Sequence, residues 1–298
     1  MVNPAIKINP TVLATALEGL LAPDAQAALT AAIGGLPLTG SGLIVLESET
    51  ASFAALIAAR AARPLGPLVD QRRFAPEGDR YTVAELDAIL IAAALRPEQR
   101  NILTLEALDT AGELAIARLL RTVEEPPAPT LFIACVRDRA RLGIPLLGRA
   151  HAIVPLTGPG DGALEATLIT GGLARATARE LLALCYPYPQ LAVVLRDAHP
   201  EPLSMLRLLE VVATLSVDAS TLEVTAAAEA LEALTTRKDL RRDLLRCWLT
   251  RAAGRARELL ATCDPDGLAL VAAIDAATTL VDRYGSPAAV ITLVTCRR

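Results

Sequence analysis

The sequence predicts an α/β domain with a parallel sheet, followed by segments that are helical throughout. Over the first 155 residues, short apolar runs typical of strands alternate with longer stretches that have helical spacing. Turn-forming residues at 155–162, PLTGPGDG, end this pattern, and no convincing strand run follows them. Strands that alternate with helices favour a parallel sheet covered on both faces. We therefore expect three domains: an α/β domain at 1–156, a small helical domain at 157–213 and a second helical domain at 214–298.

The first predicted unit of the α/β domain lies within residues 22–62. The stretch APDAQAALTAAI at 22–33 places Pro and Asp ahead of Ala and Leu, as capped helices do, and two glycines follow it. The run GLIVLESE at 42–49 predicts a short buried strand, and FAALIAARAA at 53–62 has helical spacing. We expect a helix, a strand, a connecting loop and a second helix.

The second predicted unit contains two further strands. A helix is expected at 82–97, TVAELDAILIAAALRP, and a strand with an acidic end at 101–109, NILTLEALD. Two prolines stop an amphipathic helix at 113–127, ELAIARLLRTVEEPP, and TLFIACVRD at 130–138 is rich in β-forming residues. Ligands of open parallel sheets bind at the carboxyl ends of the strands, so a functional site is expected where these runs end.

Composition argues against several classes of protein. Of the 298 residues 53% are hydrophobic but only 3% aromatic, so Ala, Leu, Val and Ile must build the core. A net charge of −4 argues against a free-standing nucleic-acid binder. The five cysteines form no CxxC pair and there are only two histidines, which supports neither a zinc site nor a disulfide framework. No apolar run reaches the roughly 18–20 residues of a membrane span and no export signal is recognisable, so we expect a cytoplasmic protein.

The stretch ARLLRTVEEPPAPTLFIACV at 117–136 resembles the signature of AAA+ subunits of bacterial clamp loaders, in which a similar helix leads into the strand that holds the first sensor. EALD at 106–109 falls where the family has the acidic end of its Walker B strand, and LGRA at 147–150 stands where the family has a Ser-Arg-Cys motif. The resemblance covers most of the chain and is strongest at 82–150. It implies an AAA+ RecA-like domain, a helical lid domain and a C-terminal helical collar domain that joins subunits into an oligomer.

Within this family the chain resembles the delta-prime subunits of DNA polymerase III more than the subunits that hydrolyse ATP. The ATP-hydrolysing subunits carry a four-cysteine zinc module, whereas the matching stretch at 62–79, ARPLGPLVDQRRFAPEGD, has no cysteine. The resemblance implies a subunit that helps load the sliding clamp on DNA during replication. Its implied partners are the gamma or tau ATPase subunits, the delta subunit, the sliding clamp and primed DNA within the complex, with no membrane.

The loop that should bind phosphate is degenerate. A P-loop needs Gly so that the backbone can wrap around phosphates, and a Lys that reaches the β and γ phosphates. The matching loop at 47–54, ESETASFA, has neither, and Phe53 occupies the position of the Lys. Glu47 and Glu49 would place negative charge against a polyphosphate, which is unfavourable by about 1–4 kcal/mol per contact. We expect no nucleotide cofactor and no bound metal.

The residues that should hold Mg²⁺ and activate water are also altered. Glu106 stands in the place of the Walker B Asp, and Ala107 replaces the catalytic Glu. The first sensor reads 135–137, CVR, and Leu191 stands where some relatives have a second sensor Arg. Structural roles are open for two of these residues: Glu106 at the surface end of a strand, and Asp109 as the N-cap of the next helix, which we favour over metal binding.

Arg149 is the candidate for a residue that still acts. In the resembled family this arginine reaches the ATP site of the adjacent subunit, so a subunit with an inactive site of its own can still complete its neighbour's. Here Gly148 and Ala150 replace the flanking Ser and Cys, and Pro145 lies one residue closer to the arginine than in the usual pattern. The alternative is a surface arginine beside a loop.

Two other functions stay open from the sequence. The chain could be an active AAA+ ATPase in which GLPLTGSG at 35–42 is the phosphate loop, although no Lys-Ser or Lys-Thr follows that string. It could also be a diverged AAA+ protein that serves DNA repair or phage replication. Titration with nucleotide and identification of its partners would distinguish these functions.

Overall fold

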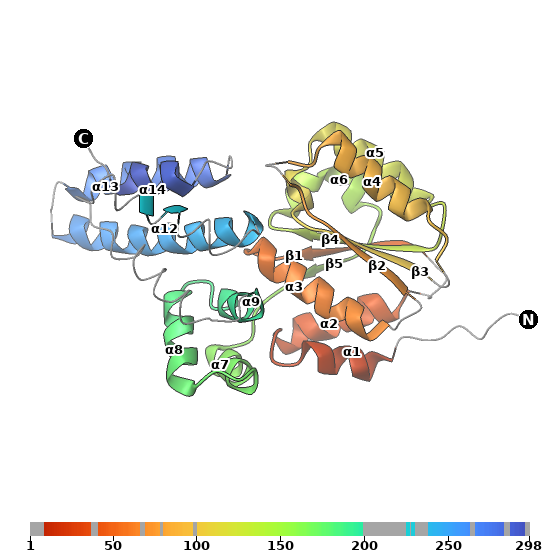
Figure 1. Ribbon diagram of the computed structural model, residues 1–298, viewed down its shortest axis with the longest axis horizontal. Coiled ribbons are helices and arrows are strands. Elements are labelled where there is room, and N and C mark those ends of the chain that lie inside the picture. Colours follow the sequence, from red (N-terminus) through yellow and green to blue (C-terminus); the bar gives the residue numbers. More distant parts are fainter. Residues whose placement is uncertain are drawn as a thin grey trace, which may run out of the picture. The chain divides into compact units, whose positions relative to one another are not determined.

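The computed structural model describes residues 9–36, 41–65, 69–77, 80–97, 100–198, 225–226, 228–229, 238–262, 266–282 and 287–295. These residues form two compact units, Met1–Ala163 and Leu164–Arg298. Figure 1 shows a sheet with helices in the first unit and helices in the second. The predicted boundary at 213/214 lies outside the described residues, so the division of the helical part into two domains stays a prediction.

The first unit is built on a parallel sheet of five strands in the order β2-β3-β4-β1-β5, which confirms the predicted fold class. The three central strands are the ones predicted from the sequence, and the two edge strands are not. β2 carries the polar stretch DQRR and exposes three of its side chains, because one of its sides has no neighbouring strand. The strands are β1 (Gly42–Glu47), β2 (Val69–Phe74), β3 (Arg100–Leu105), β4 (Thr130–Val136) and β5 (Ala150–Pro155).

Helices cover both faces of this sheet, with α1, α2 and α3 on one face and α4, α5 and α6 on the other (Figure 1). The predicted helices at 22–33, 53–62, 82–97 and 113–127 are present with ends shifted by up to three residues. The bounds are α1 (Pro10–Leu17), α2 (Pro23–Gly34), α3 (Ala51–Ala62), α4 (Val83–Ala94), α5 (Glu113–Glu124) and α6 (Gly143–Leu147), with the 3-10 turns η1 (Arg63–Leu65), η2 (Leu108–Thr110) and η3 (Arg139–Leu142).

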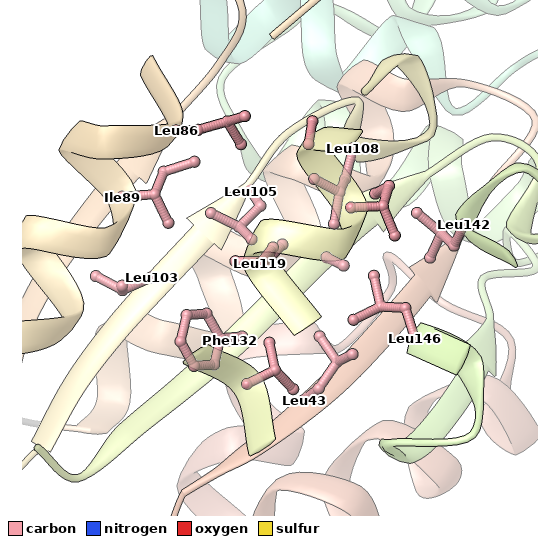
Figure 2. Close-up of a cluster of buried hydrophobic side chains, with 14 of the residues drawn as sticks. Leu43, Leu86, Ile89, Leu103, Leu105, Leu108, Leu119, Phe132, Leu142 and Leu146 are labelled. Carbon is pink, nitrogen blue, oxygen red and sulfur yellow. The ribbon is translucent and has the colours of Figure 1, made fainter. Parts of the chain in front are cut away.

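Period-two alternation along the strands builds the core on the α4–α6 face. Leu43, Leu103 and Phe132 project to this face, and so do residues two positions further along each strand. They pack against apolar side chains of α4, α5 and α6, such as Ile89 and Leu119 (Figure 2). The positions between them face α3, which contacts β1, β3 and β4.

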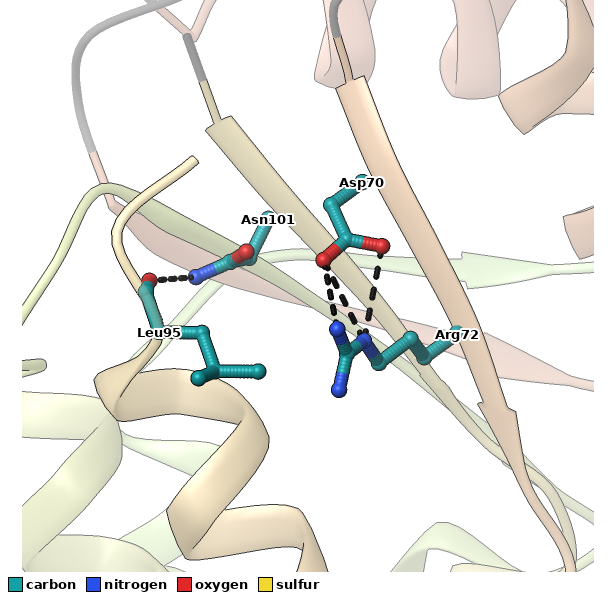
Figure 3. Close-up of polar contacts among 4 residues, drawn as sticks. All are labelled: Asp70, Arg72, Leu95 and Asn101. Atoms are coloured by element: carbon teal, nitrogen blue, oxygen red, sulfur yellow. Dashed lines mark hydrogen bonds and ion pairs between the residues drawn. The ribbon is translucent and has the colours of Figure 1, made fainter. Parts of the chain in front are cut away.

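Local hydrogen bonds fix the ends of α4. Thr82 and Glu85 form a capping box, in which the Thr82 hydroxyl accepts the Glu85 N–H at 3.2 Å. At the other end, the amide of Asn101 in β3 donates to the carbonyl oxygen of Leu95 at 2.9 Å (Figure 3). The neighbouring strand β2 carries an exposed ion pair between Asp70 and Arg72, also drawn in Figure 3.

All the regular elements that the structure describes in the second unit are helices, joined by turns. Cys247 of its longest helix lies against the end of α8, where its thiol is 3.3 Å from the carbonyl oxygen of Tyr186. Burial raises the pKa of Cys247 to about 12 and raises the pKa of Cys185 well above its usual range. No described helix of the chain combines the length and the apolar character that crossing a membrane requires. The helices are α7 (Asp161–Thr170), α8 (Arg175–Leu184), α9 (Leu191–Ala198), α12 (Lys238–Ala261), α13 (Asp266–Asp282) and α14 (Pro287–Thr295).

Candidate functional site

The candidate site lies at the carboxyl ends of β1, β3 and β4, where parallel strands present their ends at one edge. Glu47 at the end of β1 is in register with Val136 at the end of β4, and Leu105 of β3 pairs with Ala134. Glu106 follows Leu105 directly. The sheet therefore brings the predicted P-loop, Walker B and first-sensor positions together.

The loop at the predicted P-loop position is short, and several of its backbone N–H groups donate hydrogen bonds within the chain. Only residues 48–50 separate β1 from α3. The N–H of Ser48 donates to the carbonyl oxygen of Val136 at 3.0 Å, and the N–H of Thr50 donates to the Ser48 hydroxyl at 3.3 Å. The N–H of Phe53 donates to the carbonyl oxygen of Thr50 at 3.2 Å. Backbone donors that would hold phosphates in a P-loop are thus used within the protein.

The side chains around this loop do not replace the missing lysine. Phe53, at the lysine position, is fully buried in the core and does not reach the surface of the loop. Glu49 is exposed, whereas the carboxylate of Glu47 accepts the backbone N–H of Arg139 at 3.1 Å and forms an ion pair with its guanidinium. The repulsion expected between Glu47 and a polyphosphate is therefore partly offset by a cation of this chain.

Glu106 forms the most deeply buried ion pair at this edge. Its side chain is 5% exposed and accepts a hydrogen bond from Nε of Arg73 in β2 at 2.6 Å, and Nη2 of Arg73 contacts the same carboxylate oxygen. The hydroxyl of Tyr81 lies 2.7 Å from the backbone carbonyl oxygen of Glu106. The expectation that Glu106 caps a strand end at the surface is wrong, because sheet register buries it beside β2. A guanidinium from the same chain supplies the positive charge here.

The chain after β3 turns sharply at Ala107, which has a left-handed backbone conformation with φ 49°. Ala107 offers no carboxylate at the position of the catalytic Glu. The short turn η2 follows and buries Asp109, so the expectation that Asp109 caps the next helix is wrong: Gly112 is the N-cap of α5. Burial raises the pKa of Asp109, while the charge of Arg137 and backbone N–H groups of Arg137 and Asp138 act in the opposite direction.

Of the remaining sensor positions, Arg137 is partly exposed and its charge acts on Asp109, whereas the others are apolar or buried. Cys135 and Val136 are fully buried in β4. Leu191 is fully buried at the start of α9, in the second unit of the chain. Within the described part of the chain, no three His, Cys, Asp or Glu side chains are grouped so that they could hold a metal ion. The site therefore offers buried carboxylates that are bound internally instead of a metal-binding set.

Arg149 lies away from this edge, between α6 and β5. Its side chain is 54% exposed, and its Nε donates to Oε1 of Glu124, the last residue of α5, at 2.7 Å. The sequence predicted Arg149 as a candidate but did not indicate Glu124 as its partner. The acidic pair ahead of the two prolines in the 117–136 stretch was the available signal, because it places carboxylates at the end of α5.

Comparison with solved structures identifies the fold. A DNA polymerase III gamma-subunit-related protein from Thermotoga maritima aligns with a TM-score of 0.54 and 13% identity, over 86% of this chain and 93% of its own. The chain shares the fold of that protein over most of its length. The sequence indicated a resemblance to a subunit of DNA polymerase III, and the aligned structure is described as related to another subunit of that polymerase.

Lower TM-scores link the chain to two further structures. The Thermotoga maritima Holliday junction branch migration motor RuvB aligns with a TM-score of 0.41 and 15% identity, over 71% of this chain and 70% of its own. A chain of an E. coli HORMA, CdnC and Trip13 complex aligns with a TM-score of 0.37 and 18% identity, over 69% of this chain and 83% of its own. No protein-family model and no curated protein sequence matches the chain.

The first prediction concerns the ion pair at the Walker B position. Arg73→Ala should lower the free energy of unfolding by about 1–3 kcal/mol, because it removes the cation beside a buried carboxylate. Arg72→Ala, in the same strand, removes only an exposed pair and should cost less than about 1 kcal/mol. Urea unfolding followed by circular dichroism measures both values. The claim that Arg73 stabilises the buried carboxylate would be contradicted by an equal loss of unfolding free energy in the two variants. It would also be contradicted if adding Glu106→Gln to Arg73→Ala restored none of that free energy.

The second prediction concerns pH. Since burial raises the pKa of Asp109, the folded chain binds this proton more tightly than the unfolded chain, whose Asp titrates near about 4. Its ionisation therefore lowers stability as the pH rises from the unfolded pKa through the folded one. Asp109→Asn should raise Tm relative to the parent more at neutral pH than near about pH 4. Asp87→Asn removes an exposed carboxylate of α4 and is the control. A larger gain in Tm from Asp109→Asn in acid than at neutral pH would refute the prediction.

Proposed function

We propose that this chain is an ATP-incompetent, delta-prime-like subunit of a bacterial clamp loader. In this role it helps load the sliding clamp on primed DNA during replication. Its partners are the gamma or tau ATPase subunits and the delta subunit, and it offers Arg149 to the ATP site of a neighbouring ATPase subunit. Residues 1–156 form the AAA+ domain with a degenerate nucleotide site, 157–213 the lid and 214–298 the collar through which subunits assemble.

The proposal rests mainly on the hydrogen bonds and the ion pair that the chain forms with itself at the carboxyl ends of the strands. In a working P-loop the backbone N–H groups and a Lys bind the phosphates and a carboxylate holds Mg²⁺. In this chain the N–H groups of 48–54 named above donate to protein acceptors, and Phe53 is buried. The carboxylate of Glu106 is bound by Arg73. The Lys is thus absent from this loop, and several of its N–H groups and the carboxylate of Glu106 are already bonded within the chain.

The exposed position of Arg149 supports a role in trans. The guanidinium stands on a short connection between two ordered elements and is 54% exposed, so another protein can reach it. A planar guanidinium suits charge that spreads over a transferring phosphoryl group. The likeness in fold to a DNA polymerase III gamma-subunit-related protein is consistent with the proposed assembly, in which one subunit completes the site of the next.

The alternative of an active or diverged AAA+ ATPase, acting in repair or phage replication, finds less support. Its candidate phosphate loop at 35–42 precedes β1, and Gly42 is the first residue of that strand. The string therefore leads to the amino end of the sheet, whereas nucleotides bind at the carboxyl ends of parallel strands. Residues 37–40 lie outside the described part of the chain.

Nucleotide titration tests the absence of ATP chemistry. The purified chain should give no binding heat with ATP and Mg²⁺ in calorimetry up to about 1 mM, because neither a phosphate loop nor a metal site is available. The ATPase subunit from the same organism, titrated in the same way, is the positive control. Saturable binding in the micromolar range would contradict the proposal and favour the active-ATPase alternative.

Reconstitution tests the role of Arg149. Added to the ATPase and delta subunits, the chain should raise ATP hydrolysis stimulated by DNA and clamp, and Arg149→Ala should abolish hydrolysis at the one site that it completes, since arginine fingers are worth roughly 10³-fold or more. Arg118→Ala, which removes an exposed arginine of α5 paired with Asp87, should leave the rate unchanged. Full stimulation by Arg149→Ala would contradict the role in trans.

A further inference from the structure

Glu124 and Arg149 meet although they lie 25 residues apart in sequence. Oε1 of Glu124 accepts from Nε of Arg149 at 2.7 Å and lies 2.7 Å from Nη2. The carboxylate thus binds one edge of the guanidinium. A guanidinium carries five N–H donors in a fixed plane, so three remain after these two contacts. Nη1 of Arg149 has no hydrogen bond to a residue within the described ranges.

Both residues stand on ordered backbone. Glu124 ends α5, where the N–H of Glu125 donates to the carbonyl oxygen of Arg121 at 3.1 Å and Pro126 and Pro127 prevent the helix from continuing. The N–H of Arg149 donates to the carbonyl oxygen of Leu146 at 3.1 Å, and the next residue, Ala150, begins β5. The backbone on either side of the contact is therefore held by regular structure.

We propose that Glu124 is a positioning residue for Arg149, and this inference rests on the proposed function of Arg149 in trans. By binding the Nε and Nη2 edge, Glu124 fixes the plane and direction of the guanidinium and leaves Nη1 and one donor of Nη2 for the phosphate oxygens of a neighbour's ATP. The group that Arg149 would contact is thus a triphosphate bound to another subunit. Glu124 itself does not touch that triphosphate.

The energetics favour positioning over inhibition. A free arginine side chain loses rotamer entropy when it is fixed, and part of this cost is removed if the side chain is already held before the neighbour arrives. The pair is 54% and 35% exposed, so its own strength is low, and it does not compete strongly with a phosphate. An ion pair that kept Arg149 from reaching the neighbour's phosphate would need to be buried and strong, whereas a contact that only orients the side chain does not.

The experiment uses the reconstituted clamp loader with the full-length chain. Glu124→Ala should lower the kcat of DNA- and clamp-stimulated ATP hydrolysis at the completed site by about three- to tenfold, with KM for ATP unchanged, since only transition-state alignment is lost. Glu124→Gln keeps an oxygen acceptor and should restore most of the rate. Glu125→Ala is the matched control, because it removes the same charge from the adjacent exposed residue. In the Arg149→Ala background Glu124→Ala should have no further effect.

The outcomes separate this inference from the function on which it rests. If Arg149→Ala lowers the rate but Glu124→Ala does not, or if Glu124→Ala raises it, positioning by Glu124 is overturned and the role of Arg149 in trans stands. If Arg149→Ala itself has no effect, both fall. Equal losses in Glu124→Ala and Glu125→Ala would show a general effect of charge and would also overturn the inference. Unchanged Tm in the four single variants excludes a loss of folding as the cause.

Discussion

The ion pair between Arg73 and Glu106 determines what this edge of the sheet can do. A carboxylate that is only 5% exposed needs a partner of opposite charge, and in an ATP site a bound metal supplies that charge. Here a strand of the same chain supplies it, so Glu106 is satisfied without nucleotide or metal. The same contact joins the end of β2 to the turn after β3, where Tyr81 also contacts the backbone of Glu106. A nucleotide is therefore not needed to complete the folded edge.

The strands that the sequence predicted are those with a neighbour on both sides. β1, β3 and β4 are central strands, and each is rich in the apolar, β-forming residues that a sequence reveals. The edge strands β2 and β5 have a neighbouring strand on one side only, and their sequences are polar or mixed. The partner of Glu106 could not be predicted for the same reason: Arg73 lies in β2, and only the order and register of the strands bring the two residues together.

Asp109 shows a different limit of sequence reasoning. Its spacing before α5 suits an N-cap, and a local rule has no reason to reject that role. The structure inserts the turn η2 after Ala107, whose left-handed conformation is rare for a residue other than Gly, Asn or Asp. That turn directs Asp109 into the protein. A single alanine gives no sign of this conformation, so neither the burial of Asp109 nor its raised pKa could be foreseen.

A subunit that acts only on its neighbour has a different requirement from one that binds ATP. An ATP site can be ordered by its ligand, whereas a side chain that completes another subunit's site has to be held before the two meet. The internal hydrogen bonds of 48–54 and the Arg73–Glu106 pair give this domain an edge that is ordered without ligand. In the same unit, Glu124 is the last residue of α5 and Arg149 directly precedes β5. The proposed loss of the nucleotide site and the proposed role of Arg149 are therefore compatible, because an edge that is ordered without ligand can hold the scaffold on which Arg149 stands.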